Sequence, residues 1–419
     1  MRRRDFRFIS VALTIATAGT LVGGCSSTSS AQENEAARAV MEFCQSEPPD
    51  QALTQALPPG LALPADRLTL GVNPDWDAET LDQFAATTGV APGVAGSFVQ
   101  MPLTADDRRR IQSAAEEVAG IGGVLMLTLE PHQGLDAVDD ASVQELVELL
   151  ATLNDSSVPV LLRFAHEMNG SWYPWGQQPQ SYVQAFRKVA HAVAEGTSAT
   201  EMLWAPNYGG GYPFTGGEFA AAGDQTAPAS GSPDFEWADT NSDGALTEAD
   251  DPYEPYYPGD DVVDWVGLTI YHYGGASQWD GNNVPEPDKF AAQLRGAYDG
   301  LGGDESGVPD FYARYAEDRD KPMAIPETAA FVTAAADPDL ALEVKQGWWR
   351  QVYSQDLRTQ FPQLRLVNWF NFDKPELESV DLVRWSVTTD ARIGDAFGND
   401  LVDSVATAAD VVSCPEAPE

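Results

Sequence analysis

Short apolar runs alternate with amphipathic stretches from about residue 67 onward. A strand that is covered on both faces is apolar throughout, whereas a surface helix repeats its apolar positions every 3.6 residues. Eight continuous apolar runs predict strands at Leu68–Val72, Gly96–Met101, Gly123–Leu129, Val158–His166, Met202–Pro206, Val263–Tyr271, Met323–Pro326 and Leu364–Asn371. Helical periodicity predicts helices at residues 104–119, 143–153, 182–194, 290–301, 340–353 and 401–412, the first opened by a capping box at Thr104–Asp107 and the second capped by Ser142.

Eight such strands alternating with helices predict an α/β protein with a (β/α)8 barrel. A doubly wound open sheet is the alternative, but no glycine-rich phosphate-binding motif follows the first strand. A barrel places functional groups at the carboxyl ends of its strands. Polar and aromatic residues do collect there, at Arg163–Trp175, Asn207–Tyr208, Tyr271–Tyr273, Glu327 and Trp369–Phe372.

The N-terminus predicts an exported protein. Residues 1–24 combine four arginines with a short apolar stretch, as in a signal peptide, and Leu21–Cys25 resembles a bacterial lipobox. Lipidation of Cys25 would anchor the chain to the outer face of the cell membrane; an ordinary cleaved signal is the alternative. Arg3–Phe6 also resembles a twin-arginine export motif. Residues 25–66 would be a tether and N-terminal extension, and 67–414 the folded domain.

Composition narrows the possible partners. The 419 residues carry 24 Lys and Arg against 64 Asp and Glu, a net charge of −40, which repels phosphate backbones and anionic lipid surfaces. Nucleic-acid binding is therefore excluded, and a membrane would be contacted only through the lipid anchor. Cys44 and Cys414 are left as a pair in an oxidising compartment and predict a disulfide between the two ends of the domain; two unpaired thiols are the alternative. A monomer is the default expectation.

Two glutamates follow apolar strands directly and predict the chemistry. Glu167 comes after the fourth predicted strand and Glu327 after the seventh, each among aromatic residues. One such carboxylate alone would favour a structural ion pair. Two at corresponding strand ends, beside rings that can stack on sugars, favour a retaining glycosidase, whose carboxyl groups stand about 5–5.5 Å apart. No cofactor is needed for this reaction.

The segment Arg163-Phe-Ala-His166-Glu167-Met-Asn169-Gly170-Ser-Trp172 resembles the Arg-x-x-His-Glu-Met-Asn-Gly-x-Trp motif of glycoside hydrolase family 26, and the resemblance extends over residues 67–390. It implies a (β/α)8-barrel endo-β-glycanase with Glu167 as the acid/base and Glu327 as the nucleophile. It further implies substrate-site roles for five residues: Arg163 near a carboxylate, His166 in the hydrogen-bond network, Tyr271 as a donor to the nucleophile, and Trp172 and Trp369 as sugar platforms.

Two departures from the family pattern bear on the substrate. Mannan-cleaving members carry a Trp-His pair after strand three, where this chain has Glu130-Pro131-His132, and strand seven reads Pro-Glu-Thr instead of Glu-Phe-Gly. A β-1,4-mannan is the first expectation, a mixed-linkage β-1,3/1,4-glucan is a serious alternative, and β-1,3-xylan a weaker one. A carbohydrate-binding surface lipoprotein without catalysis is the competitor from another class; both glutamates are present, which disfavours it.

A long insertion at about residues 209–262, between the fifth and sixth strands, contains a twelve-residue pattern typical of calcium loops. Side-chain oxygens at positions 1, 3, 5, 9 and 12 and the carbonyl at position 7 would bind a structural Ca²⁺, and Gly244 stands at position 6. The predicted ligands are Asp239, Asn241, Asp243, Ala245, Thr247 and Asp250.

Overall fold

The computed structural model describes residues 61, 63–64, 66–214, 228–274, 282–376 and 382–411. The predicted signal peptide, Cys25, Cys44 and Cys414 lie outside these residues, so lipidation and the disulfide stay predictions. None of the helices in the described ranges has both the length and the apolar character needed to cross a bilayer.

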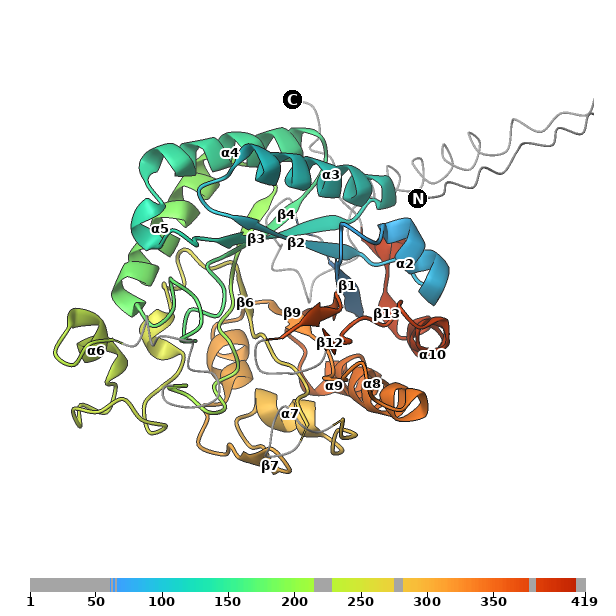
Figure 1. The fold of residues 1–419 in the computed structure, drawn as a ribbon. Coiled ribbons are helices and arrows are strands. Elements are labelled where there is room, and N and C mark those ends of the chain that lie inside the picture. Colours follow the sequence, from blue (N-terminus) through green and yellow to red (C-terminus); the bar gives the residue numbers. More distant parts are fainter. Residues whose placement is uncertain are drawn as a thin grey trace, which may run out of the picture. The chain divides into compact units, whose positions relative to one another are not determined.

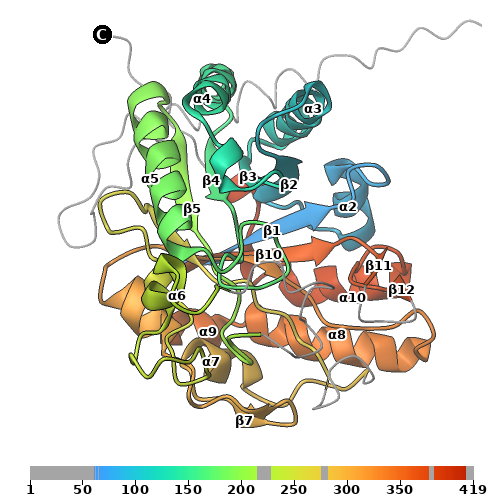
Figure 2. The same cartoon turned by 60° about the vertical axis from the view of Figure 1, so that its left-hand side comes forward.

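A closed parallel barrel forms the folded unit (Figures 1 and 2). Its strands run in the sheet order β10-β9-β6-β5-β4-β3-β2-β1, β1 pairs with β10 to close the ring, and the short β13 adds to the edge of β1. The strands are β1 (Leu68–Pro74), β2 (Val94–Gln100), β3 (Val124–Glu130), β4 (Val160–Phe164), β5 (Thr200–Trp204), β6 (Trp265–Gly267), β9 (Met323–Thr328), β10 (Leu364–Asn371) and β13 (Val405–Ala406). The predicted (β/α)8 barrel is confirmed, with every predicted strand in its place.

Side chains along each strand point alternately into the barrel and toward the helices, so the hydrophobic core has two parts. One small cluster, including Val94, Met126, Leu161, Trp265 and Leu366, takes alternate residues from the strands and fills the barrel. The larger cluster lies between the strands and the surrounding helices. Because successive side chains on a strand point to opposite faces, residues of the first set continue toward the mouth of the barrel, where ligands bind.

The helices surround the barrel (Figure 1). They are α2 (Leu81–Thr88), α3 (Ala105–Ile121), α4 (Asp140–Asp155), α5 (Pro179–Gly196), α6 (Pro233–Ala238), α7 (Lys289–Leu294), α8 (Pro338–Val352), α9 (Gln355–Gln360) and α10 (Ala391–Leu401), with single turns at Leu135–Ala137, Glu254–Tyr256 and Ala408–Asp410 and a π-helical segment at Tyr312–Glu317. Two-stranded ribbons pair β7 (Asp299–Gly300) with β8 (Gly303–Asp304), and β11 (Lys374–Pro375) with β12 (Leu382–Val383).

Local helix signals gave mixed results. The capping box at Thr104 opens α3 as predicted. The predicted cap at Ser142 is wrong, because Asp139 is the N-cap of α4 and accepts a hydrogen bond from the Ser142 N–H at 2.8 Å. The predicted helix over 290–301 ends at Leu294, since four glycines at 296, 300, 302 and 303 do not favour helix and the chain forms the β7–β8 ribbon instead.

The last predicted helix, over 401–412, is also wrong. The helix of this region is α10, which ends at Leu401, and Val405–Ala406 pairs with β1, so that tertiary pairing overrides the local pattern. Two glycines in α10 hid it from the sequence pattern. One of them is required: a Cβ at Gly398 would lie 1.5 Å from the Thr88 carbonyl oxygen, so only glycine lets α10 pack this closely on α2.

Candidate active site

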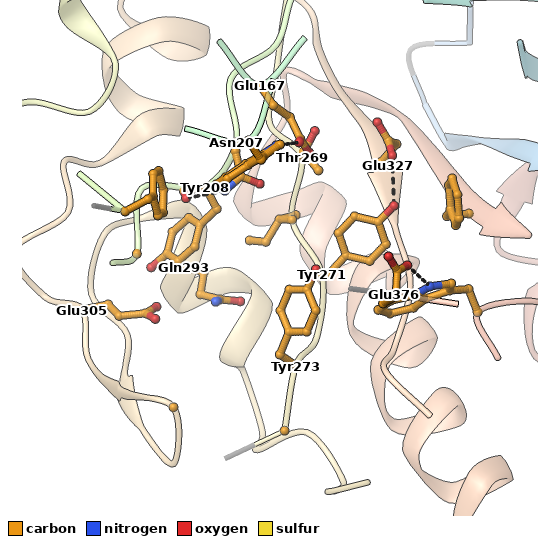
Figure 3. Close-up of a pocket in the computed structure, with 18 of the residues that line it drawn as sticks. Glu167, Asn207, Tyr208, Thr269, Tyr271, Tyr273, Gln293, Glu305, Glu327 and Glu376 are labelled. Atoms are coloured by element: carbon orange, nitrogen blue, oxygen red, sulfur yellow. Dashed lines mark hydrogen bonds between the residues drawn. The ribbon is translucent and has the colours of Figure 1, made fainter. Parts of the chain in front are cut away.

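A cleft at the carboxyl ends of the strands brings the two predicted glutamates together (Figure 3). It encloses about 370 Å³ and is lined by Glu167 after β4, Glu327 at the end of β9, and Trp172 and Tyr271 from the loops after β4 and β6. The side chains of both glutamates are almost fully buried, with residue exposures of 8% for Glu167 and 7% for Glu327. Carboxylates from two different strands therefore face the same cavity, as the barrel predicts.

Glu167 stands on an unusual stretch of backbone. Ala165 has a φ of 46° and Glu167 a φ of 52°, a region that residues other than glycine rarely enter and that is found at functional sites. The N–H of Glu167 donates to the Ala205 carbonyl at 3.0 Å and so fixes this turn to the segment after β5. Its side chain accepts a hydrogen bond from the Trp172 indole, 2.8 Å from Nε1 to Oε2.

The environment of Glu167 favours its protonated form. Burial, followed by repulsion from the Glu327 carboxylate, raises the pKa of Glu167 to about 7, although Arg163 and the Trp172 hydrogen bond act in the opposite direction. A carboxyl group with this pKa is protonated in a large fraction of molecules near neutral pH and can donate its proton to a bound molecule.

Two donors fix the side chain of Glu327. The Arg163 guanidinium, which is fully buried in the barrel, pairs with Oε1 of Glu327 and also donates to the Thr269 hydroxyl at 2.5 Å. The Tyr271 hydroxyl donates to Oε2 at 3.0 Å. A charged guanidinium and a phenol thus hold the carboxylate in one orientation, which is what a positioned nucleophile requires.

His166 lies behind the two glutamates and not on the cleft surface. Its side chain is buried, its Nε2 lies 3.3 Å from the Tyr173 hydroxyl, and its carbonyl accepts the Trp175 indole N–H at 2.7 Å. Burial, reinforced by Arg163, lowers the pKa of His166 well below its usual value, so the ring is neutral. His166 therefore belongs to the hydrogen-bond network that supports the site.

Glu130 and His132, which stand where mannan-cleaving members carry a Trp-His pair, lie close to this network. Glu130 ends β3, its carboxylate lies 3.4 Å from His132 Nε2, and burial raises its pKa, with Glu327 adding to the increase. The His132 ring packs 5.4 Å from the ring of Trp175. Neither Glu130 nor His132 is among the residues that line the cleft.

Comparison with known proteins agrees with this site. Residues 131–215, which include Glu167, match the family model for Glycosyl hydrolase family 26. The chain is 22% identical over 178 residues to endoglucanase H of Acetivibrio thermocellus and 28% identical over 74 residues to a mannan endo-1,4-beta-mannosidase of Bacillus subtilis. The segment around Glu167 is therefore similar to glycosyl hydrolase family 26.

The matches to these two relatives are partial. The two alignments cover 40% and 16% of this chain, and the chain spans only 16% of endoglucanase H and 20% of the mannosidase. A solved endo-beta-1,4-mannanase double mutant from Cellulomonas fimi shares the fold, with a TM-score of 0.50 at 19% identity over 83% of this chain and 74% of that one.

One predicted sugar platform, Trp369, is wrong. Trp369 is fully buried outside the barrel, its ring centroid 5.7 Å from that of Phe397 on α10, and its indole donates to the Trp385 carbonyl at 3.0 Å. Alternation explains the error: Leu366 fills the barrel, so Phe370 shares its face and Trp369 points to the helices. Phe370 lines the cleft.

Sequence reasoning placed Asn207 and Phe370 only among the groups at strand ends, without assigning them a role, and it missed Trp385. Trp385 is almost fully buried but lines the cleft beside Tyr271, with ring centroids 5.1 Å apart. Asn207 is tied to the motif residue Asn169, whose side-chain amide donates to the Asn207 carbonyl at 2.8 Å. Two of these residues could have been found from the sequence: Phe370 lies on the same face of its strand as Leu366, and Asn207 closely follows the fifth strand. No sequence pattern indicates Trp385.

The predicted calcium loop is folded but its metal stays a prediction. Asp239 accepts hydrogen bonds from the N–H groups of Asp243 and Gly244, and Asp250 from those of Asn241 and Thr247. Gly244 has a φ of 85°, as the sixth position of such a loop requires. In the described part of the chain, no group of three or more His, Cys, Asp or Glu side chains is placed to hold a metal ion. The three predicted carboxylate ligands, Asp239, Asp243 and Asp250, are therefore not gathered around one metal position in this structure.

Proposed function

We propose that this protein is a retaining endo-β-glycanase with Glu167 as general acid/base and Glu327 as nucleophile. The observation that carries the proposal is the contrast between two glutamates in one cleft. Glu327 is paired with a buried guanidinium, whereas burial and charge raise the pKa of Glu167 to about 7. A carboxyl group with a raised pKa beside a second one paired with a cation is the arrangement that retaining glycoside hydrolysis needs.

In the first step, Glu327 attacks the anomeric carbon of the sugar and Glu167 gives its proton to the departing glycosidic oxygen. The new ester bond removes the negative charge of Glu327. Because that charge is the second cause of the raised pKa of Glu167, the pKa of Glu167 falls once the ester forms. Glu167 is then a carboxylate, ready to take a proton from the water that hydrolyses the ester.

We propose β-1,4-mannan as the first substrate to test and mixed-linkage β-1,3/1,4-glucan as the second. The mannosidase and mannanase names among the relatives support the first choice. The relative named endoglucanase H supports the second, as does the end of β3, where Glu130 and His132 pair with each other and do not line the cleft.

The test is reducing-sugar release from galactomannan and from mixed-linkage β-glucan by the mature protein. Glu327→Ala and Glu167→Ala are the inactive controls. Asp318→Ala is the matched control, because Asp318 is an exposed residue directly after the π-helical segment Tyr312–Glu317. We expect the wild type and the Asp318→Ala control to release reducing sugar from one of the two polymers, and the two glutamate variants to release none. If the wild type released no more sugar than the glutamate variants from these polymers and from a wider panel of β-glycans, the binding-protein alternative would be favoured.

We further propose that the enzyme is exported and anchored to the outer face of the cell membrane through lipidated Cys25. The signal-like residues 1–24 and the lipobox-like Leu21–Cys25 support this. Metabolic labelling with a fatty-acid analogue tests it: the wild type should be labelled and Cys25→Ala should not. Label retained in the variant would reject the anchor.

A further inference from the structure

The strand that carries Glu327 has one residue more than the strand beside it. Along the β9–β10 ladder, Ile325 pairs with Val367, whereas the next pair joins Thr328 to Trp369. Three steps along β9 therefore match two steps along β10. An extra residue of this kind is a β-bulge, a feature that is common beside active sites, where it turns a side chain in a new direction.

The hydrogen bonds on the other side of β9 locate the bulge at Pro326. Three N–H groups of the neighbouring β6 segment, each two residues apart, bond to the carbonyls of Pro322, Ala324 and Glu327. A regular strand would offer the carbonyl of Pro326 in third place, because the acceptors that face one neighbour are two residues apart. Proline also has no N–H to give to a ladder, and inside sheets it is found at bulges. The Pro326 carbonyl is therefore left out of the ladder with β6.

The bulge decides which way Glu327 points. Ala324 belongs to the cluster that fills the barrel, and Ile325 belongs to the cluster between the strands and the helices. With strict alternation Glu327 would share the face of Ile325 and point toward the helices. Instead Glu327 faces the cleft (Figure 3). Thr328 takes the outward position, where its hydroxyl accepts the indole N–H of Trp348 on α8 at 2.8 Å.

Asn73 bonds the carbonyl that the bulge sets free. Its side-chain Nδ2 donates to the Pro326 carbonyl at 2.8 Å, and this bond is buried. Asn73 is on β1, and β10 lies between β1 and β9 in the barrel, so the amide reaches across the barrel interior. Asn368 of β10 supports it there, with Nδ2 donating to Oδ1 of Asn73 at 3.1 Å. Because a carbonyl can only accept, these two bonds fix the orientation of the Asn73 amide.

Two glycines make room for this pair of asparagines. A Cβ at Gly96 on β2 would lie 1.8 Å from Oδ1 of Asn73. A Cβ at Gly71 on β1 would lie 1.8 Å from Oδ1 of Asn368. Asn73 is 2% exposed and Asn368 is fully buried, and burying two amides costs free energy unless they are hydrogen-bonded. The bond that leads out of this pair goes to the residue directly before Glu327.

We propose that Asn73 is a positioning residue for Glu327, because its bond to the Pro326 carbonyl holds the bulge in the form that turns the carboxylate into the cleft. The inference rests on the proposed function, in which Glu327 is the nucleophile. Asn73 itself is not among the residues that line the cleft, so its loss acts through Glu327. A displacement of a reacting group by about 1 Å can lower a rate about 100-fold.

The test isolates the attack by Glu327. Asn73→Leu, which has a similar shape and no amide, is assayed on dinitrophenyl β-glycosides of the oligosaccharides that the wild type releases from its polymer. This leaving group departs without a proton from Glu167, so kcat/KM reports the attack on the sugar. We expect kcat/KM to fall about 100-fold, while the Kd for the released oligosaccharide, measured by calorimetry, changes by less than about 2-fold.

Asn368→Leu is the second variant and decides the question if Asn73→Leu does not fold. It leaves Asn73 in place but removes the donor that supports its amide. The same kcat/KM should fall by about 10-fold, again with the Kd unchanged, because a supporting bond is weakened and the bond to Pro326 is kept.

Thr69→Val is the matched control. Thr69 lies on the same inward face of β1 as Asn73, is fully buried, and its hydroxyl makes no hydrogen bond to a described residue. Its kcat/KM and Kd should equal those of the wild type. Values of kcat/KM within about 2-fold of the wild type in both asparagine variants would overturn the proposal, and so would a parallel loss of binding, which a purely structural role predicts. A wild type no more active on the glycosides than Glu327→Ala would overturn the proposed function instead.

Discussion

Replacing Glu327 by glutamine should lower the pKa of Glu167. The substitution keeps the shape of the side chain and removes its charge, which is the second cause of the raised pKa of Glu167 after burial. For carboxyl groups about 5.5 Å apart, as retaining hydrolysis requires, Coulomb's law with an effective dielectric constant of about 20 gives about 3 kcal/mol. This corresponds to about 2 pH units. The pKa of Glu167 should therefore fall from about 7 to about 5, still above the usual glutamate value because burial remains.

The measurement is an NMR titration of protein labelled with ¹³C at the glutamate carboxyl carbons, with the Glu167 signal assigned from its absence in Glu167→Gln. Glu376→Gln is the control: Glu376 lines the same cleft but accepts the Trp385 indole N–H at 2.8 Å, and it is not a cause of the Glu167 shift. This control should leave the Glu167 titration in place. A Glu167 pKa in Glu327→Gln within about half a unit of the wild type would show that the two carboxyl groups are too far apart to act on one sugar ring.

Three further outcomes follow from the same geometry. Since the pKa of Glu167 is about 7 and the acid must be protonated, kcat/KM should fall as the pH rises through 7, and a constant value up to pH 9 would contradict the acid role. Trp369→Phe should lower the free energy of unfolding by about 1–3 kcal/mol in denaturant titrations while reducing kcat/KM less than Phe370→Leu does; the reverse order of activities would restore Trp369 as a platform. If the loop at 239–250 binds calcium, EDTA should lower the Tm of the wild type by several degrees and leave Asp239→Ala unaffected, whereas identical melting with and without EDTA in the wild type would reject the ion.

The barrel could be predicted because its strands are buried on both faces and therefore read as continuous apolar runs. Leu364–Asn371 is a strand with the predicted bounds, and Glu167 and Glu327 were found because polar groups at such strand ends meet at one mouth. The helices were harder. The glycines in α10 read as helix breakers, yet Gly398 is what lets α10 approach α2.

The rest of the site depends on information that the local pattern does not carry. Trp369 and Phe370 are neighbours of similar character, and only the alternation set by Leu366 decides which of them reaches the cleft. Tyr208, Gln293 and Glu305, which also line the cleft, come from three separate segments, and their meeting is decided by how the loops close over the barrel. No periodicity in the sequence relates these positions.

The central claim, that Glu167 and Glu327 act as acid/base and nucleophile of a retaining enzyme, is tested most directly by the anomeric configuration of the first product. ¹H NMR recorded during the first minutes of hydrolysis distinguishes the α and β reducing ends before mutarotation mixes them. We predict that the β anomer appears first and that Glu327→Ala releases no product. The α anomer appearing first would mean inversion, and would contradict the assignment of Glu327 as a nucleophile.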